Sequence, residues 1–158
     1  MKTNGTVYVV AAFTLIAAFI VYQLWFSDTR RIFRRLREIE IALSVPAQET
    51  EAARLVRLAS LRRSLAPSMQ IQSAERHLQI RSRDEVLAVA GAWRAPVDVH
   101  FLDVQIGVRD KDNAADVYLT MEISRQGKDQ ETIPFAVTVG RQDGEWVVTW
   151  AAFQPAAR

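Results

Sequence analysis

A small group of side chains suited to acid–base chemistry lies late in the chain. Asp98 and His100 are two residues apart in a stretch, residues 97–109, whose alternation predicts a strand, so their side chains share one face. An imidazole beside a carboxylate can act as a general base. Asp103 has the opposite parity, which places it on the other face unless a bulge intervenes. With Tyr118 on the next predicted strand, these residues are the catalytic candidates.

The same residues also have a purely structural interpretation. An antiparallel sheet with one face in water shows alternate polar residues as well. The sequence offers no identifiable second hydrogen-bond donor for a developing negative charge, and His100 and Asp103 have only His77 as a further imidazole. We therefore expect no enzymatic activity, no metal site and no cofactor.

The composition excludes several other classes of site. The chain of 158 residues has no cysteine, which rules out a disulfide scaffold, a thiolate metal site and a thiol nucleophile. It contains no glycine-rich phosphate loop, no HExxH and no GxSxG motif. Its arginines gather beside an apolar segment rather than along a stripe with stacking aromatics, so no nucleic-acid partner is expected.

That apolar segment, residues 7–26, reads VYVVAAFTLIAAFIVYQLWF and carries no charge. Twenty helical residues at about 1.5 Å each span about 30 Å, the thickness of the hydrocarbon core of a bilayer. A cleaved signal peptide would have a shorter apolar core followed by small residues, whereas this segment ends in bulky residues followed by arginines. We predict a retained single-pass transmembrane helix after a tail of residues 1–6.

The flanks of the segment predict its surroundings. Tyr8, Tyr22 and Trp25 are the expected interfacial anchors. The small residues expected to pack against other membrane helices are Ala11, Ala12, Ala17 and Ala18. Basic residues are more numerous after the segment than before it, which favours a bacterial inner-membrane protein with its soluble domain on the cytoplasmic side. A signal anchor with the domain outside is the alternative.

Residues 27–45 predict a basic amphipathic helix, the first helix of the soluble domain. Its apolar face is formed by Ile32, Leu36, Ile39 and Leu43. Its basic residues are Arg30, Arg31, Arg34, Arg35 and Arg37. We expect these arginines to contact anionic lipid headgroups. The alternative is an ordinary domain helix with a solvated basic side, and both descriptions can hold together.

Two more helices are predicted before the pattern changes. Ser44 as a cap and Pro46 in the first turn start a second helix that runs to about Leu65. Its predicted inward residues are Leu55, Leu58, Leu61 and Leu65, and its predicted outward residues are Arg54, Arg57, Arg62 and Arg63. A short strand over residues 69–72 follows. A third helix opens with a capping box, Ser82 to Glu85, and closes before Pro96.

From residue 97 onward the apolar period is two. Four consecutive strands are predicted, and the alternation of the first slips near Phe101-Leu102, which indicates a bulge. Asp143-Gly144 is a hairpin signal before the last strand. Helices followed by an antiparallel meander predict an α+β fold, in which three helices pack on a bent antiparallel sheet behind the transmembrane helix.

This order of elements resembles the NTF2-like cone domains over about residues 29–154. The most specific piece is the last hairpin, GRQDGEWVV at residues 140–148. The resemblance implies a soluble domain over residues 46–154, followed by a tail of residues 155–158. NTF2-like enzymes such as ketosteroid isomerases and dehydratases work inside the mouth of the cone. A membrane helix before such a domain is similar to the inner-membrane scaffold component of type IV secretion systems, whose domain lies outside the cytoplasm, and this opposes the charge rule.

Charge is segregated along the chain. Twelve arginines against five glutamates give residues 30–83 a surplus of seven positive charges, whereas seven basic against twelve acidic groups leave residues 84–158 five negative. A basic pole on the bilayer would present an acidic surface to a partner. The sequence therefore predicts a non-catalytic accessory or scaffold subunit of a larger bacterial membrane complex, whether photosynthetic, respiratory or secretory.

The expected partners are membrane lipids, other integral membrane subunits and a second copy paired through the sheet face. The alternative function is a membrane-anchored NTF2-like enzyme or small-ligand-binding protein that uses the cone pocket.

Overall fold

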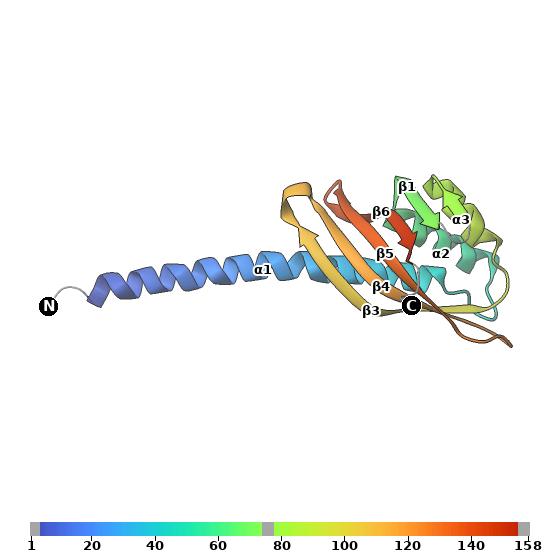
Figure 1. Cartoon of the computed structure of the whole chain (residues 1–158), viewed down its shortest axis with the longest axis horizontal. Coiled ribbons are helices and arrows are strands. Elements are labelled where there is room, and N and C mark those ends of the chain that lie inside the picture. Colours follow the sequence, from blue (N-terminus) through green and yellow to red (C-terminus); the bar gives the residue numbers. More distant parts are fainter. Residues whose placement is uncertain (1–3, 74–77, 155–158) are drawn as a thin grey trace.

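The computed structural model describes residues 4–73 and 78–154. One long helix, α1 (Asn4–Leu43), projects away from the remaining elements over its first half and packs among them over its second half (Figure 1). The part of the chain from residue 27 to residue 154 is called the head below. Within the described residues, α1 is the helix that is long and apolar enough to cross a membrane, and its residues 12–22 are all exposed.

The apolar segment and the basic helix, predicted as separate elements, form this one unbroken helix. No proline or glycine lies between Gly5 and Pro46, so nothing in the sequence interrupts the backbone hydrogen bonds. Asp28, a weak helix former at the junction, receives hydrogen bonds from Arg141 at 2.6 Å and from the Trp146 indole at 3.4 Å. The apolar segment therefore continues into the head without a linker.

The second helix begins later than predicted. α2 (Glu51–Ser64) is capped by Thr50, whose hydroxyl accepts from the amide of Ala53 at 3.2 Å. Ser44, the predicted cap, closes the end of α1 instead, with its amide donating to the Glu40 carbonyl at 3.2 Å. The helix also ends one residue earlier than predicted.

The predicted faces of α2 are wrong at two positions. Leu55, predicted inward, is 58% exposed, and Arg57, predicted outward, is only 8% exposed. Leu65 is buried as predicted, but as the first residue of β1 (Leu65–Ser73) rather than as part of the helix. Arg57 is predicted to face water because it is charged. Its burial depends on partners that are distant in sequence.

The third helix forms where the capping signal predicts it. α3 (Arg83–Ala92) follows β2 (Leu78–Ile80), and the Ser82 hydroxyl accepts from the amide of Glu85 at 3.3 Å. The Glu85 carboxylate accepts in return from the amide of Arg81 at 3.0 Å, one residue before the cap. The predicted N-terminus is confirmed.

We expect Ser82→Ala to lower the free energy of unfolding by about 1 kcal/mol, because the amide of Glu85 loses its acceptor. A urea titration of the full chain in mild detergent measures this. Ser68→Ala, at an exposed position of β1, is the control and should change little. An equal loss in both variants would show that the cap does not stabilise α3.

Four strands follow in antiparallel order, as predicted: β3 (Val97–Arg109), β4 (Ala114–Arg125), β5 (Glu131–Gln142) and β6 (Glu145–Phe153), with a short 3₁₀ turn at Asp110–Asp112 between the first two. The full sheet has six strands in the order β2-β1-β6-β5-β4-β3. β1 pairs in parallel with β6, so the sheet is mixed. The prediction of a purely antiparallel sheet is wrong for this pair of strands. The predicted bulge is confirmed by a register shift between Leu102 and Gln105.

The free edge of β3 is covered by the end of α1. Val45 and Val97 exchange backbone hydrogen bonds of 2.7 and 3.0 Å, and the hydroxyl of Ser44 accepts from the amide of Val99 at 3.0 Å. An uncovered edge strand presents unpaired amide and carbonyl groups. The chain that leaves α1 therefore completes the hydrogen bonding of the first half of β3.

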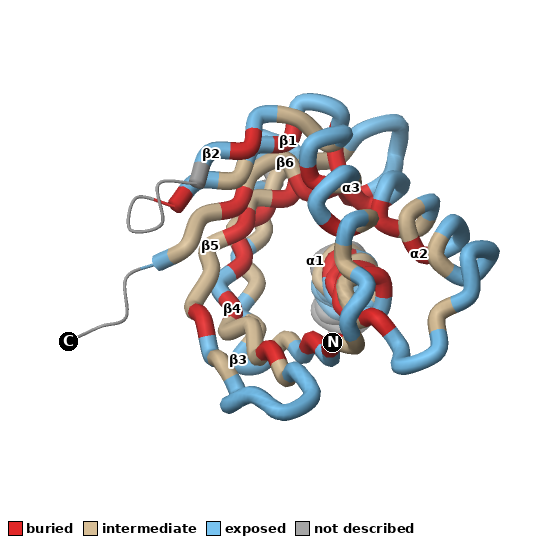
Figure 2. Tube along the Cα trace, turned by 90° about the vertical axis from the view of Figure 1, so that its right-hand side faces the viewer, coloured by how far each residue is buried: buried red, intermediate tan, exposed pale blue. Residues whose placement is uncertain are grey.

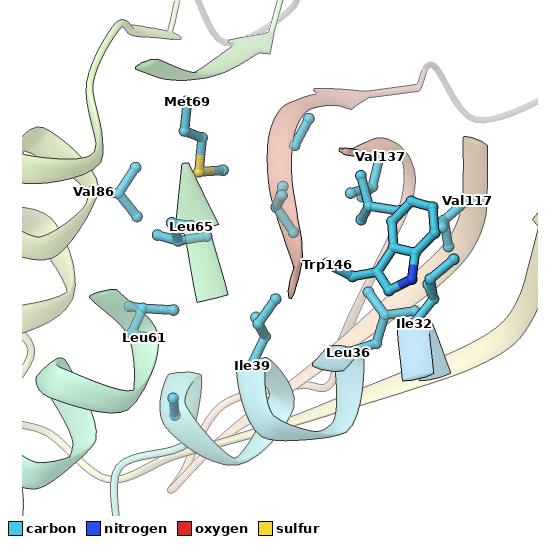
Figure 3. Close-up of a cluster of buried hydrophobic side chains, with 14 of the residues drawn as sticks. Ile32, Leu36, Ile39, Leu61, Leu65, Met69, Val86, Val117, Val137 and Trp146 are labelled. Atoms are coloured by element: carbon cyan, nitrogen blue, oxygen red, sulfur yellow. The ribbon is translucent and has the colours of Figure 1, made fainter. Parts of the chain in front are cut away.

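The core lies between α1 and the sheet. Figure 2 shows α1 end-on, with the sheet curving around one side and α2 and α3 on the other. Ile32, Leu36 and Ile39 point from α1 toward the strands, as the sequence predicted, and Trp146 of β6 lies among them and is 3% exposed (Figure 3). The buried residues Val117, Val137 and Val139 belong to the same cluster. Aliphatic side chains and one indole thus fill this space.

Candidate functional site

Asp98 and His100 of β3 lie in contact. His100 Nε2 lies 3.2 Å from Asp98 Oδ2, on the face that period-two spacing predicted. Both side chains are open to solvent, with exposed fractions of 49% and 64%. This contact therefore lies at the surface of the edge strand.

A third residue, the acidic Glu40, which the sequence did not indicate, joins them from α1. Glu40 Oε1 lies 3.7 Å from His100 Nδ1, and Glu40 Oε2 accepts from the amide of Phe101 at 3.0 Å. Its side chain is 10% exposed and also lies 3.4 Å from Arg37. We name Glu40, Asp98 and His100 the edge cluster. Both ring nitrogens of His100 face a carboxylate, but only the contact with Asp98 is within hydrogen-bonding distance.

The other two candidates do not join the edge cluster. Asp103 lies in the bulge with a φ of 52° and is exposed. Tyr118 pairs with Gln105, whereas His100 pairs with Glu122, four residues away along β4. At about 3.3 Å per strand residue, this separates Tyr118 from His100 by about 13 Å. The four candidates therefore do not converge on one point.

The basic residues of α1 divide into two groups. Arg30, Arg31 and Arg34 are exposed. Arg35 is 17% exposed, and its guanidinium donates to Glu38 and Glu145 at 2.7 Å each and to the Trp146 carbonyl at 2.9 Å. Arg35 is thus bound to residues of the head, and the lipid contact predicted for it stays a prediction.

The residues predicted to lie within or at the ends of a bilayer are described only in part. Ala12, Ala17, Ala18 and Tyr22 are exposed. The side chains of Tyr8, Ala11 and Trp25, like His77 and residues 155–158, lie outside the described part of the structure. The exposed positions remain open for the contacts predicted for them.

Comparison with known proteins gives a likeness of fold. No family model and no curated protein matches the chain. Among solved structures, an NTF2-like protein of unknown function from Pseudomonas putida shares 12% identity over 84% of this chain and 89% of its own, with a TM-score of 0.63. A proposed scytalone dehydratase from Novosphingobium aromaticivorans shares 14% over 84% and 86%, also with a TM-score of 0.63.

The chain has an NTF2-like fold. The association domain of CaMKII from Caenorhabditis elegans has it too, with 15% identity over 82% of this chain and 96% of that domain and a TM-score of 0.63. Identities this low establish the fold and nothing about activity.

Two grooves of the NTF2-like head lie around the start of β3. One of about 720 Å³ lies where the end of α1 meets the start of β3 and the end of β4, and it is lined by Ile41, Pro46, Val97 and Arg125, among others. A second of about 330 Å³ adjoins it and includes Trp93 and Arg94. We name the larger one the end groove.

In this NTF2-like head, Glu40 acts as a structural acceptor. We expect Glu40→Leu to lower the free energy of unfolding by about 1–3 kcal/mol, because the amide of Phe101 loses the carboxylate acceptor that it has at the covered edge. Glu40→Gln keeps an acceptor oxygen and should cost less. Urea titrations of the three forms measure the difference, and Asp98→Asn serves as the exposed control. Equal stability of wild type and Glu40→Leu would contradict this role.

Proposed function

We propose that this chain is a non-catalytic, membrane-anchored scaffold subunit of a larger bacterial membrane complex. The observation that carries the proposal is the filled interior: Trp146, Ile32 and Leu36 occupy the space between α1 and the sheet, where an enzyme with a cone pocket would hold its substrate. The candidate acid–base residues Asp98 and His100 lie instead on a solvent-exposed face of β3. This apolar packing between α1 and the sheet supports a binding role over catalysis.

The apolar half of α1 serves as the anchor in this proposal. Its length and composition suit a bilayer, and it continues directly into the head. With the hydrocarbon core ending near Phe26, Arg30 and Arg31 lie about 6–8 Å beyond it along the helix axis. This is the depth of the headgroup layer, so these two arginines would contact anionic lipid.

We place the head on the cytoplasmic side of the inner membrane, because the exposed arginines follow the apolar segment directly. Protease digestion of sealed vesicles of known orientation tests this placement. Digestion of the head only from the periplasmic side would reverse it, without affecting the scaffold proposal.

The outer face of the sheet is a further proposed contact, with a second copy of the chain. One row of paired residues crosses this face from β3 to β6 and consists of Gln105, Tyr118, Ala136 and Ala152. Tyr118 is 52% exposed, and the row carries no charge. Interface centres are typically depleted in charge and enriched in aromatic residues. The fold supports association in at least one neighbour, the association domain of CaMKII.

The test of the scaffold proposal is purification of the full chain from its native membrane in mild detergent. We expect a stable particle that contains other membrane-spanning subunits in fixed proportion, visible on a native gel and identified by mass spectrometry. A chain that runs alone, or only with its own copies, would contradict the proposal.

One observation favours a second function, a membrane-anchored enzyme or ligand-binding protein. The edge cluster pairs an imidazole with two carboxylates, and one structural neighbour is a proposed scytalone dehydratase. His100→Ala separates the two functions. The scaffold proposal expects unchanged recovery of the complex and unchanged cell growth, whereas the enzyme alternative expects lost growth with the complex intact.

A further inference from the structure

One face of α1 remains uncovered after it enters the head. This face carries four residues, Phe33, Arg34, Arg37 and Ile41. Arg37 is four residues from Phe33 and from Ile41 and three from Arg34, so the four lie along one side of the helix. Phe33 is 53% exposed, Ile41 is 65% exposed, and the side chain of Arg37 is 67% exposed. The opposite side, which includes Ile32 and Ile39, is buried in the core. We name these four exposed residues the outer stripe.

Lipid cannot cover the whole outer stripe. With the hydrocarbon core ending near Phe26, Phe33 lies about 10 Å and Ile41 about 22 Å further along the axis, at about 1.5 Å per residue. The headgroup layer is only about 5–8 Å deep. A helix tilt of about 40°, the upper end of the usual range, still leaves Ile41 about 17 Å beyond the hydrocarbon core. At that tilt Phe33 lies about 8 Å beyond the core, at the outer limit of the headgroup layer, whereas Ile41 stands where only water or protein reaches it.

The outer stripe leads into the end groove. Ile41 belongs to both, and the groove continues past Pro46 and Val97 to Arg125, which is half exposed. The apolar track starts beside two exposed arginines, Arg34 and Arg37, of which Arg37 lies 3.4 Å from the largely buried Glu40. At the far end Arg125 lies 3.9 Å from Glu131 and shares the groove lining with Asp98, so the surplus of exposed positive charge lies along the stripe. A second copy, anchored in the same direction, would bring arginines against arginines. The charge therefore favours an acidic occupant.

We propose that the outer stripe and the end groove are the docking site for an acidic amphipathic helix of another membrane subunit, which leaves the bilayer beside α1. This inference rests on the proposed scaffold function and names the partner's chemistry. Apolar side chains of the partner pack on Phe33 and Ile41, and its carboxylates pair with Arg34 and Arg37. The stripe alone is long enough for about two turns of a helix, since eight residues of α1 cover about 12 Å, and the groove extends it.

The test is site-specific photocross-linking of the full chain in native membranes. The photoreactive residue p-benzoylphenylalanine is placed at Phe33, at Arg37 or at Ile41, and at Leu55 of α2 as an equally exposed control. We expect the three stripe positions, but not Leu55, to cross-link one protein, in a segment rich in Asp and Glu directly after a membrane span, mapped by mass spectrometry. Cross-links to lipid, to a second copy or to a basic segment, or no cross-link at all, would overturn the proposal.

A charge reversal supplies the second measurement. Arg34→Glu should reduce the yield of that cross-link from Ile41 about tenfold, which corresponds to about 1.4 kcal/mol. Arg63→Glu, on the exposed side of α2, should leave the yield unchanged. Both changes lie at the surface, so urea titration should show an unaltered head. An unchanged yield in Arg34→Glu would remove the electrostatic part of the proposal and with it the acidic partner.

The two proposals fail in different ways. If the chain purifies within a complex but the outer stripe gives no cross-link, this inference is wrong and the scaffold function stands. If the chain purifies alone, the scaffold function is wrong as well.

Discussion

Arg57→Ala is expected to lower the free energy of unfolding of the head by about 3–5 kcal/mol. The Arg57 guanidinium is bound to Glu49 at 2.6 and 3.2 Å, and both side chains are less than 10% exposed. It also donates to the carbonyls of Ala42 in α1, at 3.1 Å, and Ala90 in α3, at 3.5 Å. One side chain of α2 thus binds the ends of the two neighbouring helices, and its removal leaves a buried carboxylate without a partner.

The control for Arg57 is Arg63→Ala, on the same helix at an exposed position, which should stay within about 0.5 kcal/mol of wild type. A double variant, Arg57→Met with Glu49→Leu, should be more stable than Arg57→Ala, because no buried charge remains unpaired. Urea titration of the full chain in mild detergent, followed by tryptophan fluorescence, measures all four forms. A double variant no more stable than the single one would show that the ion pair is not the source of the loss.

Ile32→Ala should lower the same free energy by about 2–5 kcal/mol. Ile32 is fully buried against the cluster that contains Leu36 and Trp146, only six residues beyond the apolar segment. Removal of three side-chain carbons leaves a void that the strands on one side and α2 on the other cannot close. The change therefore weakens the packing that joins α1 to the sheet.

Phe33→Ala is the matched control for Ile32, because the neighbouring Phe33 ring is 53% exposed whereas Ile32 is fully buried. It should change the urea midpoint little, although the docking proposed above expects it to weaken the partner contact. Equal destabilisation by the two substitutions would indicate that the helix is stabilised along its whole circumference and not by one buried face.

Most of the sheet could be predicted from the sequence. The strands from Val97 onward alternate with a period of two, their turns carry local signals such as Asp143-Gly144, and consecutive strands pair with their neighbours. The first strand, β1, was predicted too short. Leu65 and Ala66 follow a helix with leucines at helical spacing, and only their pairing with β6, more than eighty residues later, makes them extended.

The candidate site was predicted in part. Period-two spacing placed Asp98 and His100 on one face correctly. Glu40 was counted only as a charge opposing the arginines, because nothing local indicates that its carboxylate reaches the amide of Phe101, 61 residues away. Arg57 was assigned to water for the same reason. Residues that join distant elements through polar contacts carry no periodic signal, so only the folded structure identifies them.

Because α1 has no hinge, the proposed anchored arrangement fixes the rotational orientation of the head relative to the apolar segment. No flexible linker lies between Phe26 and Ile32, so the head cannot rotate independently of the apolar segment. The side of the helix that contacts neighbouring helices in the bilayer therefore determines the direction in which the outer face of the sheet points. One inserted residue would turn the head by about 100° and raise it by about 1.5 Å. Seven inserted residues would restore nearly the original orientation of the head and would place it about 10 Å further from the membrane.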